Sequence, residues 1–235
     1  MNYIIILISF LFATSSMASP YPKVDADLAT YDQTIVKMKS EFAVTTANPK
    51  DKEWVKAKLD FMFNIDQYMR NYWNTPFKQK YNEAETQYFN EHFYPKHAGL
   101  DSENTKELKE LLKIYDWFKI SEFGVKADNQ AWLIVQHADL EIQFQKDVLL
   151  ILEKLYPLKE TKPSNYAYLY DRVACSSNDP TQQKLQRYGT QGKCVGPAKW
   201  EPHPMEDPEN VDKRRAEMGL DTMAEYQLMF KDVCH

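Results

Sequence analysis

The most apolar helix that this chain can form carries polar side chains in its middle. The segment runs from Ala131 to Leu140 and reads Ala-Trp-Leu-Ile-Val-Gln-His-Ala-Asp-Leu. Polar groups inside a buried helix cost free energy unless a partner satisfies them. Gln136, His137 and Asp139 therefore require partners from elsewhere in the fold, and they are the first candidates for a functional site.

The helical period places His137 at a boundary between two faces. It falls between an apolar stripe that includes Leu133 and Phe144 and a polar stripe that includes Gln136 and Gln143. A histidine in such a position can act as a general acid or base near neutral pH. The alternative is a core histidine bound to one carbonyl group, and the pattern alone favours that alternative.

The first residues predict a signal peptide. Residues 4–13 form an apolar run that is too short to span a bilayer, which takes about 20 residues. Ser16-Met17-Ala18 fits the rule for signal cleavage, so we expect cleavage after residue 18. No later apolar run is long enough to cross a membrane, so we expect a periplasmic or secreted protein.

Charge and length narrow the class of protein. The net charge is −5, which argues against a nucleic-acid binder because such a protein would carry a basic patch. The length suits one domain with a helical extension. We therefore predict an N-terminal helical extension over 19–54 and a single helical domain over 55–235.

Three cysteines follow the signal segment, and an oxidising compartment favours pairing between two of them. Three pairings are possible. We favour Cys175 with Cys194, which would close a loop of about 20 residues and leave Cys234 free. A zinc site is disfavoured because no close Cys/His pair is present, so no metal is expected.

Hydrophobic periodicity predicts a mainly α-helical fold. Helices are expected at 25–43, from Asp51 to the region before Pro76, at 77–91 and from Asp101 onwards, with Pro95 and Gly99 between the last two. The apolar helix of the opening is expected to run from 128 to about 156, after a break at Gly124.

A short segment with β character interrupts these helices. Residues 166–170 are rich in tyrosine, which suits a strand, and glycines gather at 189–196. A hairpin over about 166–195 is therefore predicted. Together with the apolar helix, this hairpin would form the walls of a polar pocket. Asp207-Pro208 then predicts the start of another helix, which stops at Gly219.

Asp171 and Arg172 stand together at the end of the predicted strand. Neighbouring side chains in a strand point to opposite faces, so each would need its own partner. Asp171 could orient an imidazole, and Arg172 could bind an anion. An isolated Asp-Arg dipeptide is more often a charge pair at the surface.

Two further motifs offer polar side chains. Asp66 and Arg70 are four residues apart, which lets them pair on one helix face. The segment from Tyr188 to Gln191, with Gly189 and Thr190 between them, supplies uncharged hydrogen-bonding groups of the kind found in substrate loops. A hairpin turn would give a similar pattern.

Taken together, the motifs resemble an uncharacterised bacterial family recorded as a domain of unknown function. The resemblance covers roughly residues 55–228, and it implies a shared polar site without implying a substrate. The residues that carry it are Asp66-Gln67 with Arg70, Gln136-His137-Ala138-Asp139, Asp171-Arg172-Val173, Tyr188-Gly189-Thr190-Gln191, Glu206-Asp207-Pro208, and Arg214-Arg215.

An enzyme is one interpretation of these motifs. His137 would be the general acid or base, with Asp139 or Asp171 holding its ring and Arg172 stabilising negative charge. The chemistry would be hydrolysis or another acid/base reaction on a small molecule or envelope polymer, with no cofactor. The substrate-binding residues would be Asp66, Arg70, Gln136, Tyr188, Thr190, Gln191, Asp207 and Arg215.

The main alternative is a non-enzymatic periplasmic interaction protein, such as an immunity protein that neutralises a toxin. Its polar set would be a closed structural network. A sensor or carrier of a small ligand is a third interpretation. An enzyme requires His137 in a pocket open to solvent, whereas a structural network would seal it from water.

Overall fold

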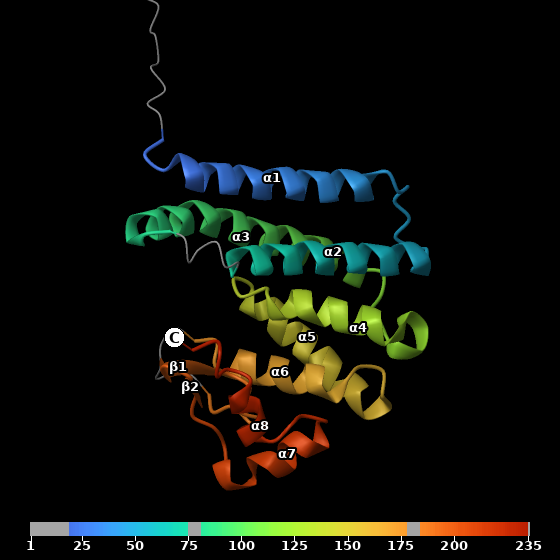
Figure 1. The fold of residues 1–235 in the computed structure, drawn as a ribbon. Coiled ribbons are helices and arrows are strands. Elements are labelled where there is room, and N and C mark those ends of the chain that lie inside the picture. The colour runs from blue at the N-terminus through green and yellow to red at the C-terminus, as the bar shows by residue number, and fades with distance from the viewer. Residues whose placement is uncertain (1–18, 75–80, 178–183, 235) are drawn as a thin grey trace, which may run out of the picture.

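The computed structural model describes residues 19–74, 81–177 and 184–234, which are mainly helical (Figure 1). The predicted signal segment lies outside these residues. Helices α1 (Pro22–Ala43), α2 (Lys52–Trp73) and α3 (Glu83–Leu112) run alongside one another. Among the described residues, no helix has the length and apolar character needed to cross a membrane.

The middle of the chain forms a second group of helices. These are α4 (Ile120–Gln136), α5 (Ile142–Leu155), the short 3₁₀ helix η2 (Tyr156–Leu158) and α6 (Pro163–Ala174). Helix α2 packs on α4, and α5 packs on α6. The α2 helix therefore joins the two groups, because its side chains enter both hydrophobic cores.

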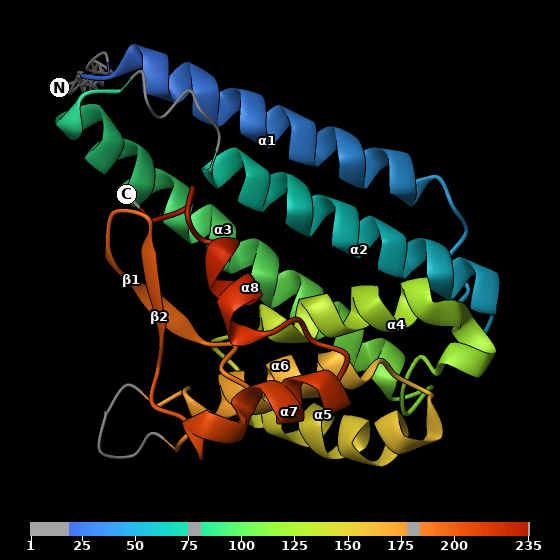
Figure 2. The same cartoon turned by 60° about the horizontal axis from the view of Figure 1, so that its bottom comes forward.

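The last part of the chain packs against α6 and contains the only strands of the described residues (Figure 2). Strand β1 (Gly192–Gly196) pairs antiparallel with β2 (Lys199–Pro202). The 3₁₀ helix η4 (Pro208–Asn210) and helices α7 (Val211–Glu217) and α8 (Met223–Leu228) follow. The predicted class, mainly α with a small hairpin, is confirmed.

The two cores use different halves of α2: its first half enters one core and its second half enters the other. Val24 and Leu28 of α1 pack with Ile65 of α2 and Phe89 of α3 in one core. The other core is larger and is built from α2, α3, α4, α5 and α6. The predicted boundary between residues 54 and 55 falls inside the first turn of α2, and the proposed division into extension and domain stays a prediction.

The prediction of one helix from 128 to 156 is wrong. Helix α4 ends at Gln136 and α5 begins at Ile142, so His137 lies in the link between them. The buried amide of Gln145 donates hydrogen bonds to the carbonyls of Val135 (3.0 Å) and Gln136 (3.4 Å). These bonds satisfy carbonyl groups that the break removes from the helical ladder.

The predicted break near Pro95 and Gly99 is also wrong. Helix α3 continues through both residues, and Asp101 lies inside the helix. A proline within a helix costs about 3 kcal/mol. Burial of Phe89, Phe93 and neighbouring apolar side chains against α1 and α2 offsets this cost, since each fully buried side chain contributes about 1.5–3 kcal/mol.

The predicted strand at 166–170 is helical, and the hairpin lies later, at 192–202. Pro163 occupies the first turn of α6, where its missing N–H costs nothing. The alternating tyrosines at 166, 168 and 170 suit a strand. The buried residues Tyr166, Ala167 and Leu169, however, share one face of a helix, whereas 166 and 167 would point to opposite faces of a strand.

The disulfide joins Cys194 to Cys234, not to Cys175 as predicted. Cys194 lies on β1, and Cys234 packs with Trp200 of β2 in a small apolar cluster. Cys175 ends α6 and is a free thiol. The tertiary fold therefore brings the chain end to the hairpin, which loop length alone did not indicate.

Candidate functional site

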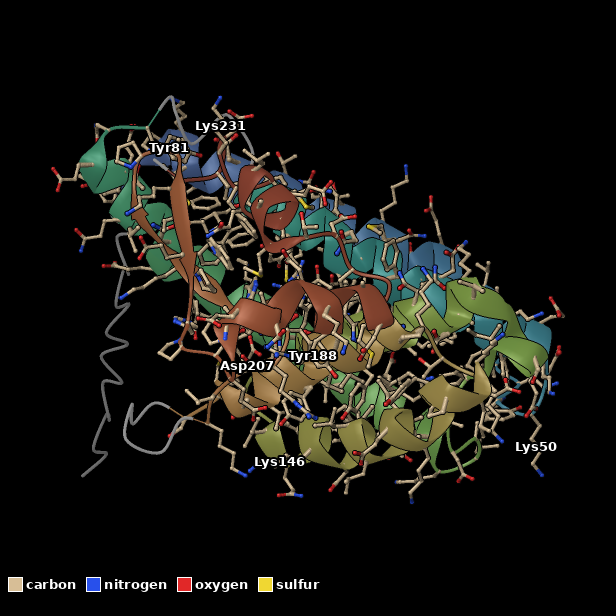
Figure 3. All side chains as sticks on the ribbon, turned by 90° about the horizontal axis from the view of Figure 1, so that it is seen from below. Lys50, Tyr81, Lys146, Tyr188, Asp207 and Lys231 are labelled. Atoms are coloured by element: carbon tan, nitrogen blue, oxygen red, sulfur yellow. A yellow bond between two sulfur atoms is a disulfide. The ribbon has the colours of Figure 1, made fainter. Side chains whose placement is uncertain are left out.

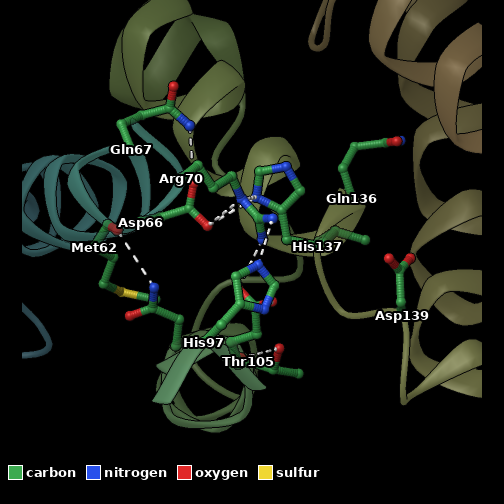
Figure 4. Close-up of polar contacts among 12 residues, drawn as sticks. Met62, Asp66, Gln67, Arg70, His97, Thr105, Gln136, His137 and Asp139 are labelled. Atoms are coloured by element: carbon green, nitrogen blue, oxygen red, sulfur yellow. Dashed lines mark hydrogen bonds and ion pairs between the residues drawn. The ribbon is translucent and has the colours of Figure 1, made fainter. Parts of the chain in front are cut away.

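The guanidinium of Arg70 lies at the centre of a polar cluster between α2, α3 and the link after α4 (Figure 4). Its Nη2 donates to Oδ1 of Asp101 at 2.8 Å. Its Nη1 lies 3.1 Å from Nε2 of His97. Its Nε lies 3.3 Å from Oδ1 of Asp66 and 2.9 Å from Nδ1 of His137. One cation therefore contacts two carboxylates and two imidazoles.

The imidazole of His137 is bound to the buried carboxylate of Asp66. Nδ1 of His137 lies 2.8 Å from Oδ1 of Asp66, whose side chain is fully buried. Burial raises the pKa of Asp66, but the hydrogen bond and charge of His137 and the charge of Arg70 outweigh it and hold that pKa below its usual range. Asp66 is therefore an anion.

This charge assigns the proton on His137. A ring nitrogen either carries a proton or accepts one, so Nδ1 cannot bond both Asp66 and the donor Arg70. Because Asp66 is ionised, we assign the proton to Nδ1, which donates it to the carboxylate. The Nε–H of Arg70 then shares the same carboxylate oxygen. Nε2 of His137 has no hydrogen-bond partner among the described residues.

His137 is one of the residues that line a pocket of about 190 Å³. Its side chain is 18 % exposed, so the ring is not sealed from solvent. The walls come from α3 and from the link between α4 and α5, whereas the hairpin predicted as a wall contributes no residue. The lining residues are Tyr94, His97, Ala98, Asp101, Ser102, Thr105, His137, Ala138, Asp139, Leu140 and Glu141.

His97 and Asp101 lie one turn apart on α3 and line the same pocket. Burial and the charge of Arg70 hold the pKa of His97 below its usual range. Burial raises the pKa of Asp101 to about 6; Arg70 opposes that rise and the charge of Asp66 supports it. Sequence reasoning missed both residues, and their spacing of four on one helix was the signal that could have indicated them.

Asp66, Asp101 and His137 offer ligand atoms that all lie within 4.8 Å of one another. Carboxylate oxygens and imidazole nitrogens suit several divalent cations. The guanidinium of Arg70, however, lies among these atoms and bonds to both carboxylates. In this arrangement Arg70 supplies the positive charge that the carboxylates require.

Arg172 and Asp139 form a separate ion pair next to the cluster. Nη1 of Arg172 lies 2.9 Å from Oδ1 of Asp139, and its Nε donates to Oε1 of Gln136 at 2.7 Å. These bonds connect α6 to the link that carries His137. Asp139 lines the pocket because it belongs to the link between α4 and α5. Its carboxylate pairs with Arg172 and not with His137.

Asp171 lies elsewhere, although it precedes Arg172 in the chain. It is fully buried and accepts hydrogen bonds from the backbone of Arg187 (2.7 Å) and Thr190 (2.9 Å) and from the Thr190 hydroxyl (3.0 Å). Burial raises the pKa of Asp171 despite these donors. The prediction that Asp171 and Arg172 have separate partners is confirmed, although they stand on a helix.

The loop at 187–190 is held from its other side by the C-terminal helices. Buried Arg215 donates to the carbonyl of Tyr188 at 2.6 Å, and the hydroxyl of Tyr226 donates to the carbonyl of Thr190 at 3.1 Å. Gly189 has a φ of +69°, and a Cβ there would lie 2.6 Å from Sδ of Met223. Only glycine fits this turn.

We call Asp171, the loop at 187–190 and Arg215 the C-terminal clamp. Gln191 extends it, because its backbone N–H donates to the side-chain Oε1 of Gln186 at 2.9 Å. Tyr188 and Asp207 are labelled in Figure 3, and Asp207 contacts Asn210 and Arg214. The structure does not bring the predicted ligand-binding residues of this region to the pocket; none of Tyr188, Thr190, Gln191, Asp207 and Arg215 lines it.

A protein-family model matches residues 64–234 of the chain. The matching family is described as a family of unknown function, DUF6624. The match spans both the His137 cluster and the C-terminal clamp, and the predicted membership of an uncharacterised domain family is confirmed. Neither the comparison with curated proteins nor the comparison with solved structures gives a match.

Proposed function

The chain belongs to this family of unknown function, and we propose that it is an acid–base enzyme whose proton-transfer group is Nε2 of His137. One observation carries the proposal. The buried Asp66 carboxylate binds Nδ1 at 2.8 Å, while His137 lines a pocket and its side chain is 18 % exposed to solvent. A base needs a fixed ring and a free nitrogen, and both conditions are met.

Asp66 would be the positioning residue for this ring. An ionised carboxylate on Nδ1 holds the imidazole in one orientation and stabilises the imidazolium that forms when Nε2 takes a proton. Because Asp66 is fully buried, water does not compete for its oxygens. Its fixed place on α2 also limits rotation of the ring.

Arg70 would keep this arrangement in place. Without a cation, the Asp66 and Asp101 carboxylates would repel each other in a region of low dielectric. The guanidinium bonds both and so fixes α2 against α3. Its three nitrogens already have partners inside the cluster, so we assign Arg70 to positioning and not to capture of an anionic substrate.

The reaction class we propose is hydrolysis or a related acid/base transfer on an envelope substrate. The predicted signal segment and the disulfide both favour an oxidising, exported setting. His137 would draw a proton from a water molecule in the pocket. Arg172 would hold Asp139 and the link in place beside it.

The test uses purified mature protein and a panel of chromogenic glycosides, esters, peptides and phosphoesters. His137→Ala should remove any turnover that the wild type shows. His92→Ala is the matched control, because His92 lies exposed on α3 with its ring bound to the Tyr88 carbonyl. Both variants should keep the wild-type circular dichroism spectrum.

A second assay needs no substrate. Diethyl pyrocarbonate modifies imidazole nitrogens that carry a lone pair, and mass spectrometry locates the product. His137 should react, and Asp66→Asn should change its rate more than that of His92. Absence of modification at His137 under conditions that label His92 would overturn the proposal, and would favour the non-enzymatic interaction protein.

A further inference from the structure

The His137 cluster has one more negative charge than positive charge when both of its aspartates are ionised, so a bound proton would neutralise the excess. With His137 neutral, as the base proposed above must be, Asp66 and Asp101 each carry a negative charge when ionised. Among the described residues, Arg70 is the one permanent cation that contacts both. The side chains of these two aspartates are 0 % and 14 % exposed, so solvent compensates little of the excess. A buried charge without a partner is costly, and a bound proton removes it.

His97 is not the place for this proton. Unlike Nδ1 of His137, Nε2 of His97 has no carboxylate partner among the described residues. A guanidinium can only donate, so the contact of 3.1 Å from Nη1 of Arg70 is made to a lone pair on Nε2 of His97. The single ring proton then lies on Nδ1, which faces Oδ2 of Asp101 at 3.5 Å. A second proton would create a cation directly against Arg70.

Asp101 is suited to hold it. Oδ1 accepts from Arg70 at 2.8 Å, while Oδ2 has only the longer contact with His97. The side chain lines the same pocket as His137. Burial, with the nearby charge of Asp66, raises the pKa of Asp101 to about 6 against the effect of Arg70, which agrees with the charge count.

We propose that Asp101 is the general acid that works with His137 in the reaction proposed above, on which this inference rests. Nε2 of His137 takes a proton from water as its oxygen bonds to the substrate. The bond to the leaving group breaks with its electron pair, and the leaving atom takes the carboxyl proton of Asp101. His137 then releases its proton to solvent and Asp101 regains one, so charge and protons balance.

The lining of the pocket favours a substrate with a neutral reacting group. Asp139 and Glu141 place carboxylates on its wall beside the carboxylic acid of Asp101, and no lysine or arginine is among its lining residues. These charges would repel a phosphoester. An ester, amide or glycosidic bond, whose leaving oxygen or nitrogen needs a proton, fits this arrangement.

Carbon-13 NMR of protein labelled at aspartate carboxyls tests the acid directly. Between pH 4 and 8, one signal should titrate with a midpoint of about 6. Asp101→Asn should remove that signal, and Asp139→Asn, a change in the same pocket, should retain it. If Asp101→Asn does not fold, through-bond assignment in the wild type gives the same answer. An Asp101 carboxyl that is fully ionised above pH 5 would overturn the proposal.

Leaving groups of different basicity separate the two proposals. On substrates with a poor leaving group, Asp101→Asn should lower kcat about 10²-fold or more, a typical contribution of general acid catalysis. On p-nitrophenyl substrates of the same class, the loss should be small because the leaving group needs no proton. His137→Ala should lower both rates. If Asp101→Asn lowers both rates equally, the assignment of Asp101 as general acid is wrong and the proposed function still stands. If His137→Ala lowers neither rate, the proposed function itself is wrong.

Discussion

The carboxylate of Asp66 lies 2.8 Å from Nδ1 of His137, although 71 residues separate the two in the chain. Asp66 comes from the middle of α2, and His137 follows the last residue of α4. These two helices pack closely through the larger core. The contact is therefore set by helix packing and would be lost if either helix shifted by one turn.

Asp66→Asn should release the ring of His137. The amide would put a neutral group opposite Nδ1 and leave Arg70 with one carboxylate fewer. We expect a loss of about 1–3 kcal/mol in the free energy of unfolding. Nitrogen-15 NMR should show that the Nδ1–H tautomer of His137 is no longer fixed. Asp60→Asn is the control on the same helix, since Asp60 pairs at the surface with Lys126. An unchanged tautomer in Asp66→Asn would contradict the assignment.

The pKa of Asp101 predicts how stability depends on pH. The folded value of about 6 exceeds the ordinary value of 3.8, so the folded state binds this proton more tightly than the unfolded state. Its contribution is complete below pH 3.8 and is lost as the pH rises through 6. A difference of about two pKa units corresponds to about 3 kcal/mol.

Urea unfolding from pH 4 to pH 8 checks this prediction. The stability of the wild type relative to Asp101→Asn should fall by that amount across the range. Asp66, whose pKa is lowered, acts in the opposite sense and loses its contribution as the pH falls, but it is present in both proteins. A difference between the two proteins that does not vary with pH would contradict the prediction.

Asp171→Asn should destabilise the fold without disturbing the His137 ring. Its fully buried carboxylate accepts hydrogen bonds from three backbone N–H groups of the loop at 187–190 and from the Thr190 hydroxyl. An amide group cannot accept them all. We expect a loss of about 3 kcal/mol in urea unfolding. Asp147→Asn on α5, where Gln143 donates to an exposed carboxylate, should cost little. A change in the nitrogen-15 signals of His137 equal to that of Asp66→Asn would show that the two networks are not separate.

Cys194→Ser should cost more stability than Cys175→Ser. The Cys194–Cys234 bond joins residues 40 apart, and the chain-entropy model gives about 4 kcal/mol for a loop of that size. Cys175 is unpaired, so its change to serine removes no cross-link. Mass spectrometry of unreduced peptides identifies the bond, and thermal unfolding measures the cost. A peptide that links Cys175 to Cys194 would restore the pairing that the sequence favoured.

The sequence indicated the polar centre of the site because polar residues interrupt an otherwise apolar helical pattern there. Polar residues within an apolar helical pattern marked His137, and a spacing of four marked Asp66 and Arg70. The partner of His137 was assigned to Asp139 or Asp171, which are near it in the motif order. Long-range packing of α2 on α4 decides that partner, and no local pattern contains it.

The errors in the fold have a similar origin. Local propensity predicts that a helix ends at Pro95 and Gly99, because it does not include the stabilisation from burying Phe89 and Phe93. That false break also hid His97 and Asp101 by placing them in different elements. The alternating tyrosines at 166, 168 and 170 indicated a strand, but the residues that enter the larger core beside α5 are those on one helical face, at 166, 167 and 169.

The peptide bond between Asp171 and Arg172 connects the C-terminal clamp to the pocket. One side chain fixes the loop at 187–190, and the other fixes the link that carries His137. A chain that ended before residue 187 would lack the loop donors that Asp171 accepts from. The unsatisfied carboxylate would then destabilise the turn of α6 that also holds Arg172. No described residue from 187 onwards lines the pocket, yet we expect that the enzyme we propose cannot be trimmed to a smaller catalytic unit.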